Sequence, residues 1–178
     1  AVGSERFPRA YLEIIAVDPE AEPAGGRARW FDMDDEGLRA QVRTHGPRLI
    51  HWVARVPDLA QAVDALAAHG IDRGERMQAS RMTPSGLLEW QITVRPDGQR
   101  LFGGCLPTLI AWGAVHPVDG MQASGPSLRA LRLAHPDAAR LRAALAAAGL
   151  TAIAVEAAPV PAIEAVLDTP RGAVVLVS

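Results

Sequence analysis

The clearest pattern of apolar and polar positions runs from Arg48 to Ile71. Residues 49–56 are rich in the aliphatic, β-branched and aromatic types that favour a strand. Pro57 ends this strand, and Asp58 is a good helix N-cap. Gly70 stands where a glycine would end the helix. Between them, apolar residues recur at helical spacing: Leu59, Ala62, Val63, Leu66 and Ala67.

The same strand-helix unit occurs a second time over residues 127–150. Asp137 lies 79 positions after Asp58, and Gly149 lies 79 positions after Gly70, so no residue is gained or lost across the helix. Self-similarity of this kind indicates a duplicated supersecondary unit. The offset places an alanine opposite His51, so the scaffold is repeated but its titratable ring is not. This difference favours a chemical role for His51.

The pattern of elements predicts an α/β (α+β) protein of tandem β-α-β-β-β modules. The central module covers residues 48–117, and a shorter C-terminal module covers 118–178. Residues 1–47 read as a partial module and linker, with one strand over 10–17 and a short helix over 34–44. We expect the missing strand and helix of this partial module to precede Ala1. After the first strand-helix unit, strands are predicted over 77–82, 87–94 and 106–112; after the second, over 152–156, 163–168 and 173–177.

Composition narrows the class of protein. The chain has 178 residues, is 49% hydrophobic and 21% charged, and carries a net charge of −2, which is typical of a soluble globular protein. No stretch concentrates arginine, and no apolar run approaches the ~20 residues of a membrane span, so neither nucleic acid nor membrane binding is indicated. The single cysteine, Cys105, fits a reducing cytoplasm. The absence of lysine and asparagine suggests a GC-rich bacterial genome.

Three polar residues within predicted strands are candidates for chemistry. Glu13 needs a partner if it is buried, and the partner could be a metal, His51 or an arginine. His51 is either a hydrogen-bonded core histidine or a ligand. Glu89 could line a cleft or face solvent, because strand side chains alternate between faces. Trp90 and Trp112 either pack in the core or wall an apolar cleft.

Four segments resemble those of one known family. They read YLEIIAVDP at 11–19, RWF at 29–31, RLIHWVARVPDL at 48–59 and LPTLIAWG at 106–113. Together with the tandem modules, they resemble the glyoxalase-like domain proteins of the vicinal oxygen chelate superfamily, which includes glyoxalases, bleomycin resistance proteins and extradiol dioxygenases. The resemblance implies a fold in which paired modules curve their mixed sheets into a cleft.

The resemblance also implies a divalent metal in that cleft, one of Zn, Ni, Fe or Mn. Glu13 matches the family's last-strand carboxylate and His51 its first-strand histidine, so both are expected as metal ligands. The metal would act as a Lewis acid on a small oxygen-bearing substrate in a lyase, isomerase or dioxygenase reaction. Glu13 or Glu89 would move the proton. Ala111, with Trp90 and Trp112 on the cleft wall, stands near a further ligand position and offers no carboxylate.

The alternative is a metal-free protein of the same fold that sequesters a small apolar or aromatic compound. The missing ligands at Ala111 and Ala130 favour it. In both interpretations the partner is a small molecule in the cytoplasm. A third interpretation makes the C-terminal module a packing surface or the interface of a homodimer, formed by its alanine-rich helix over 137–148.

Overall fold

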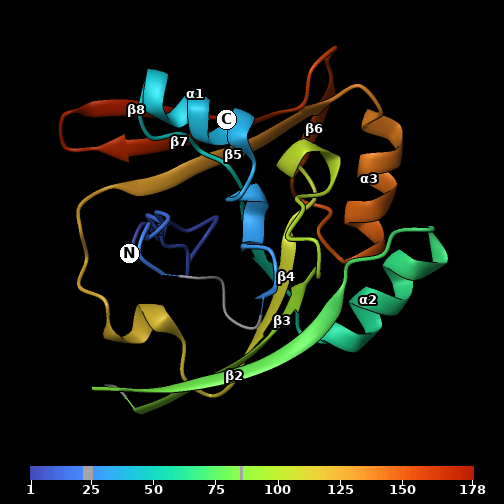
Figure 1. Cartoon of the computed structure of the whole chain (residues 1–178). Helices are drawn as coiled ribbons and strands as arrows, with labels where there is room; N and C mark the ends of the chain where they lie inside the picture. Colours follow the sequence, from blue (N-terminus) through green and yellow to red (C-terminus); the bar gives the residue numbers. More distant parts are fainter. Residues whose placement is uncertain (22–25, 85) are drawn as a thin grey trace.

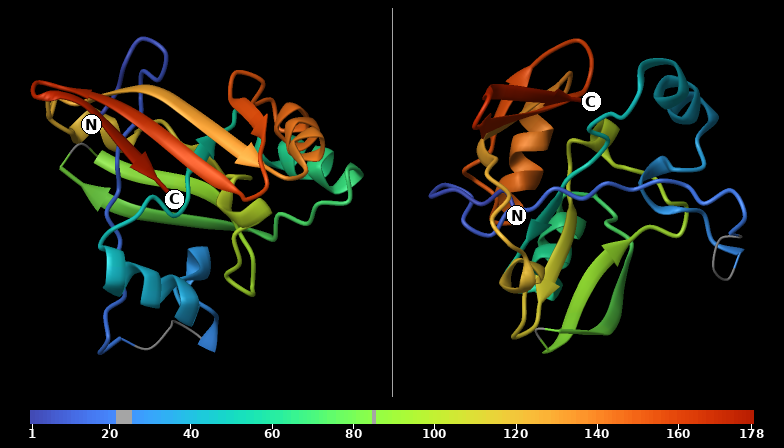
Figure 2. Two further views of the ribbon diagram at one scale, coloured as in Figure 1. Left: turned by 90° about the horizontal axis from the view of Figure 1, so that it is seen from above. Right: turned by 90° about the vertical axis from the view of Figure 1, so that its left-hand side faces the viewer.

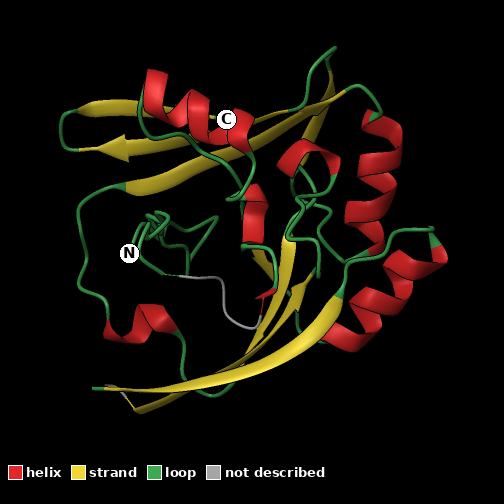
Figure 3. Cartoon of the chain, in the orientation of Figure 1, coloured by secondary structure: helices red, strands yellow, loops and turns green. Residues whose placement is uncertain are grey.

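The computed structural model describes residues 1–21, 26–84 and 86–178 and shows a mixed α+β fold (Figure 1). Its strands form two four-stranded mixed sheets, with orders β1-β4-β3-β2 and β6-β5-β7-β8. Figure 3 shows the strands in yellow and the helices that accompany them in red. Each sheet carries one parallel pair, which requires a crossover connection. None of the helices in the described structure has the length and apolar character needed to span a bilayer.

The first sheet is built by the central module. Its elements are β1 (Val53–Arg55), α2 (Leu59–Ala68), β2 (Glu75–Thr83), β3 (Gly86–Val94) and β4 (Thr108–Trp112). Strand β1 runs parallel to β4, while β4, β3 and β2 pair antiparallel. The predicted strand over 49–56 shrinks to three residues. His51 and Trp52 instead bond through their side chains to the segment before β4.

The second sheet is built by the C-terminal module. Its elements are β5 (Ser127–His135), α3 (Ala138–Ala147), β6 (Ala154–Ala157), β7 (Ala162–Thr169) and β8 (Gly172–Val177). The order along the chain repeats that of the central module, as predicted. The order within the sheet does not, because β5 lies between β6 and β7 whereas β1 lies at an edge. The short β6 pairs directly with β5, and the β7-β8 hairpin joins the other side.

The duplicated strand-helix unit is confirmed in detail. Helices α2 and α3 have ten residues each and begin 79 positions apart. The carboxylate of Asp58 accepts from the N–H of the residue three positions on at 2.9 Å, and Asp137 does the same at 3.1 Å. Gly70 and Gly149 both end their helices with positive φ, at 68° and 76°. In each case the next N–H bonds back five residues into the last turn, which is a Schellman ending.

One hydrophobic core joins the two modules. Helices α2 and α3 lie side by side (Figure 1) and both contribute to it. Cys105 is fully buried here, and its Sγ lies 3.5 Å from the carbonyl oxygens of both Ala134 and Ala162, either of which can accept its single S–H. Each large apolar side chain buried in this way contributes about 1.5–3 kcal/mol. The core includes Leu66, Leu109, Leu133, Leu141, Leu145 and Ile163.

The N-terminal region differs from the prediction. Residues 10–17 form no strand, and Ile14 is 89% exposed. A sequence with strand propensity forms a strand only where a neighbouring edge supplies hydrogen bonds, and no strand of the described structure pairs with this segment. The predicted short helix does form, as α1 (Glu36–His45), with Asp35 as its N-cap. Figure 2 shows α1 standing apart from both sheets.

Candidate functional site

The two faces of the first sheet have different surroundings. Register pairs Trp90 with Trp112 across β3 and β4, and their ring centroids lie 5.7 Å apart. Both rings pack against a small apolar cluster formed by Ile92, Val94 and Ile110. Ala111, one position before Trp112, packs instead against the core on the helix side. The structure therefore groups Trp90 with Trp112 and places Ala111 on the opposite face.

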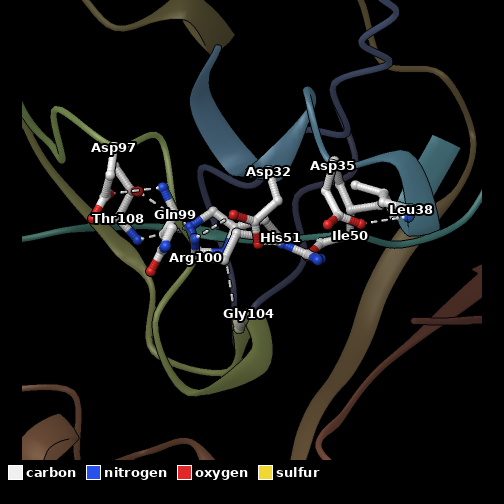
Figure 4. Close-up of polar contacts among 10 residues, drawn as sticks. All are labelled: Asp32, Asp35, Leu38, Ile50, His51, Asp97, Gln99, Arg100, Gly104 and Thr108. Carbon is white, nitrogen blue, oxygen red and sulfur yellow. Dashed lines mark hydrogen bonds and ion pairs between the residues drawn. The ribbon is translucent and has the colours of Figure 1, made fainter. Parts of the chain in front are cut away.

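His51 lies just before β1, and both of its ring nitrogens are engaged (Figure 4). Nδ1 is 3.1 Å from the carbonyl oxygen of Gly104. Nε2 accepts from the backbone N–H of Thr108 at 3.1 Å and lies 3.1 Å from the hydroxyl of the same residue. Only one protonation state satisfies these partners: a neutral ring with the proton on Nδ1. The ring is therefore a fixed bridge between two segments.

The electrostatic surroundings keep His51 neutral. Burial, aided by the nearby positive charges of Arg73 and Arg100, lowers its pKa from 6.5 to about 3, against the opposing effect of the hydrogen bond with Gly104. The ring of Phe31 covers it, with centroids 4.9 Å apart. A proton on Nε2 would also meet the N–H of Thr108, which already points at that nitrogen.

Arg73 is the most unusual charged residue of the site. It is only 3% exposed, yet no carboxylate forms a salt bridge with it within the described structure. Its Nε donates to the carbonyl of Pro107 at 2.7 Å, and its Nη2 donates to the hydroxyl of Thr108 at 2.8 Å. Its Nη1 is buried and has no hydrogen-bond partner among the residues that the structure describes. Burial lowers the pKa of Arg73 to about 10, so the group stays charged at neutral pH.

These contacts form one directed chain of hydrogen bonds. Arg73 donates to the hydroxyl of Thr108, which in turn donates to Nε2 of His51. His51 then donates from Nδ1 to the carbonyl of Gly104. Each of these three links joins a donor to an acceptor, so together they orient the guanidinium and the imidazole, while Nη1 of Arg73 stays outside the chain.

A short turn, η2 (Trp30–Asp32), covers this network. Phe31 and Asp32 have φ values of 63° and 56°, in the left-handed region that residues other than glycine rarely adopt. The turn is held there by the carboxylate of Asp32, which accepts from Nε of Arg100 at 2.9 Å. The N–H of Asp32 also donates to the carbonyl of Gly98 at 3.0 Å. Strained backbone that is held by several contacts occurs mainly at functional sites.

A small cavity lies between this turn and the first sheet. Its volume is about 10 Å³, which is room for a single water molecule. The lining combines two aromatic side chains with charged and polar groups: Trp30, Phe31, Arg73, Thr93, Gln99 and Thr108. The cavity therefore adjoins Arg73, which forms no salt bridge in the described structure, and Thr108, whose hydroxyl links Arg73 to His51.

The carboxylates predicted for the site lie elsewhere. Glu13 is exposed on the irregular N-terminal segment, where its charge raises the pKa of Tyr11, second to the effect of burial. Glu89 is exposed on β3, next to Trp90 and on the other face of the sheet. Within the described residues, no hydrogen bond or ion pair joins either carboxylate to His51. The structure does not bring the three predicted residues together.

The residues present do not fit a divalent metal at His51. The described chain contains no group of three or more histidine, cysteine or acidic residues that could hold one. A metal on His51 would have to displace the N–H of Thr108 or the carbonyl of Gly104. It would also approach the positive charge of Arg73, which opposes a cation.

Sequence reasoning missed Arg73 and Thr108. Neither belongs to a recognisable motif: Arg73 follows α2 in a loop, and Thr108 opens a strand of ordinary apolar pattern. The only available signal was the segment RWF at 29–31, which belongs to the family resemblance and forms most of the covering turn. The hydrogen bond between Arg73 and Thr108 joins residues 35 positions apart, so it can be recognised only once the fold is known.

A comparison with known families now identifies the class. The model of the glyoxalase-like domain matches residues 5–149, which is well over half of the chain. The chain therefore belongs to the glyoxalase-like domain family, within the vicinal oxygen chelate superfamily. The match includes the central module and the second strand-helix unit and ends before β6. No curated protein matches the chain.

Proposed function

We propose that this glyoxalase-like protein binds a small oxygen-bearing molecule without a metal, at the cavity beneath the Trp30–Asp32 turn. The observation that carries the proposal is the state of His51, whose two nitrogens already serve the protein's own hydrogen bonds. If His51 turned toward a metal, the N–H of Thr108 would lose its acceptor. An unsatisfied buried donor costs about 1–3 kcal/mol.

The groups around the cavity suit a ligand with both polar and apolar parts. Arg73 and Thr108 offer polar contacts at its inner end. Trp30, which is 38% exposed, offers an aromatic surface at the outer end. A few polar groups among aromatic walls are the usual composition of small-molecule sites. Because the cavity holds about one water, a ligand of several atoms must insert one end and displace the turn.

The metal-dependent lyase, isomerase or dioxygenase activity implied by the family stays a prediction. It requires that His51 give up one hydrogen bond and that further ligands join it. Glu13 would have to move from its exposed segment to the cavity. The binding experiment described next separates the two functions directly.

The test is a ligand screen by NMR in the presence of EDTA, observing the indole N–H signals of the tryptophans. The library contains 2-oxo acids, hydroxy acids and small aromatic compounds. We expect hits that shift the Trp30 signal, assigned with a Trp30→Phe variant, with the same affinity with and without chelator. Trp52 is the internal control, because its indole N–H is fixed to the carbonyl of Cys105. Binding that appears only after addition of Mn, Fe, Ni or Zn would overturn the proposal.

A further inference from the structure

We infer that Nη1 of Arg73 is the anchor for a carboxylate on the ligand, whose apolar body lies against Trp30. The inference rests on the proposed function and adds the chemical class of the ligand. Three observations support it: Nη1 of Arg73 has no acceptor among the described residues, Arg73 forms no salt bridge there, and the adjoining cavity is small.

The unmet donor is held in a fixed position. Two of the three guanidinium nitrogens of Arg73 bond to the protein, through the carbonyl of Pro107 and the hydroxyl of Thr108. These bonds leave the planar group no freedom to turn Nη1 toward another protein acceptor. Buried polar groups almost always have a partner, so an NH2 group without one, on a residue that lines the cavity, indicates a site for an acceptor from outside.

The missing counter-ion distinguishes Arg73 from the arginines around it. Arg95 pairs with Asp97, and Arg100 pairs with Asp32. Asp72 is the acid next to Arg73 in sequence, but its side chain is 81% exposed. It accepts from the N–H of Gly74 and forms its ion pair with Arg95. Asp72 acts on the charge of Arg73 only at a distance, so within the described structure Arg73 is a buried cation without a salt bridge, which an anionic ligand would supply.

The size of the cavity favours a carboxylate over a larger oxyanion. Its volume of about 10 Å³ admits one oxygen atom at a time. A carboxylate is flat and can insert one oxygen toward Nη1 while its carbon points outward. A phosphate that inserts one oxygen brings a tetrahedral group with its further oxygens to the cavity mouth, so it must displace the turn further than a flat carboxylate does. The outer lining by Trp30 and Phe31 suits a flat apolar group attached to that carbon.

The experiment compares benzoate with benzamide, which has the same shape but no charge. Each is titrated into the protein with EDTA at constant ionic strength, and the Trp30 indole signal is followed. We expect benzoate to bind about tenfold or more tightly than benzamide, because hydrogen bonds to a charged acceptor are roughly twice as strong as neutral ones. Inorganic phosphate should leave the signal unchanged.

Variants then assign the effect to one residue. Arg73→Met should abolish the preference for benzoate, and Arg73→Lys should reduce it several-fold while keeping the charge. Arg129→Met is the control: this arginine does not line the cavity and already pairs with Asp168, so the preference should survive. Thermal unfolding of each variant confirms that the protein compared is folded. The comparison of the two probes on the unaltered protein holds even if a variant fails to fold.

Equal affinity of benzoate and benzamide would overturn the carboxylate anchor while leaving metal-free binding intact. Failure of both probes to shift the Trp30 signal, or tighter binding of phosphate, would likewise overturn it. A preference for benzoate that survives in Arg73→Met would move the anchor to another group and also contradict the inference. Failure of the broader screen in EDTA would instead count against the proposed function.

Discussion

The backbone N–H of Thr108 donates to Nε2 of His51 at 3.1 Å, and the hydroxyl of Thr108 lies at the same distance from that nitrogen. Val53 pairs with Thr108, the first residue of β4, so the parallel ladder ends there, and His51 contacts Thr108 through its ring instead. This explains why a segment with strand character from residue 49 is assigned as strand only from Val53. His51, which the family resemblance predicts to be a metal ligand, here joins two segments of the chain through hydrogen bonds.

The first prediction concerns the pH dependence of stability. The pKa of His51 falls from 6.5 to about 3 on folding, so between these values the unfolded chain binds a proton that the folded protein does not. The stabilisation is therefore complete above pH 6.5 and is lost as the pH falls toward 3. Between about pH 7.5 and about pH 4.5, the free energy of unfolding should fall by about 2–3 kcal/mol more in the parent than in His51→Gln.

Urea unfolding at the two pH values measures this difference, and His45→Gln serves as the control. His45 is exposed on α1, so its variant should keep the pH dependence of the parent. If His51→Gln and the parent lose stability equally on acidification, the neutral buried ring is not the cause.

The second prediction concerns the ion pair that holds the covering turn. Asparagine also tolerates positive φ, so Asp32→Asn removes the charge that pairs with Arg100 and one of the two oxygens that accept from that residue. Because the two side chains are 24% and 16% exposed, we expect a loss of about 1–2 kcal/mol, between exposed and buried pairs. Quenching of tryptophan fluorescence by acrylamide should also increase as Trp30 is released.

The matched control is Asp168→Asn, which breaks the pair with Arg129 between half-exposed side chains. This change should alter the free energy of unfolding by less than about 1 kcal/mol and leave the quenching unchanged. Equal effects of the two substitutions would show that the Asp32 pair does not hold the turn.

The third prediction concerns Gly98, beneath the same turn. A Cβ there would lie 2.2 Å from the carbonyl oxygen of Arg29, and φ is 69°. Gly98→Ala must therefore displace the chain that leads into the turn, and we expect a loss of about 3 kcal/mol or more together with altered Trp30 fluorescence. At Gly46, φ is 82° but a Cβ would meet no atom within 4 Å, so Gly46→Ala should cost only about 1–2 kcal/mol. Similar losses at both positions would contradict the close approach.

The parts of the fold that could be predicted are those set by local sequence. The caps Asp58 and Asp137 and the terminal glycines Gly70 and Gly149 act within one turn of helix, so the pattern alone located both helices. The order of strands in the second sheet could not be predicted, because pairing depends on which edges are free. The predicted strand over 10–17 was wrong for the same reason, because no free edge pairs with it in the described structure.

The candidate site likewise combines features that local sequence indicates with others that depend on contacts between distant segments. His51 was identified because it interrupts an apolar pattern, but its role depends on Thr108, which lies 57 positions away. Arg73 gave no signal, since an arginine in a loop is ordinarily exposed and only the fold buries it. Trp90 and Trp112 were correctly placed on strands, whereas the face that each residue occupies followed from register.

The central claim is that His51 serves the protein's own hydrogen bonds and that ligand binding needs no metal. Elemental analysis tests it most directly, on protein purified without chelator or affinity-tag metal and then loaded with Mn, Fe, Ni and Zn in turn. We predict less than stoichiometric metal in the parent, and the same amount in Glu13→Ala and His51→Ala. Stoichiometric metal in the parent that is lost in both variants would contradict the account and restore the metalloenzyme implied by the family.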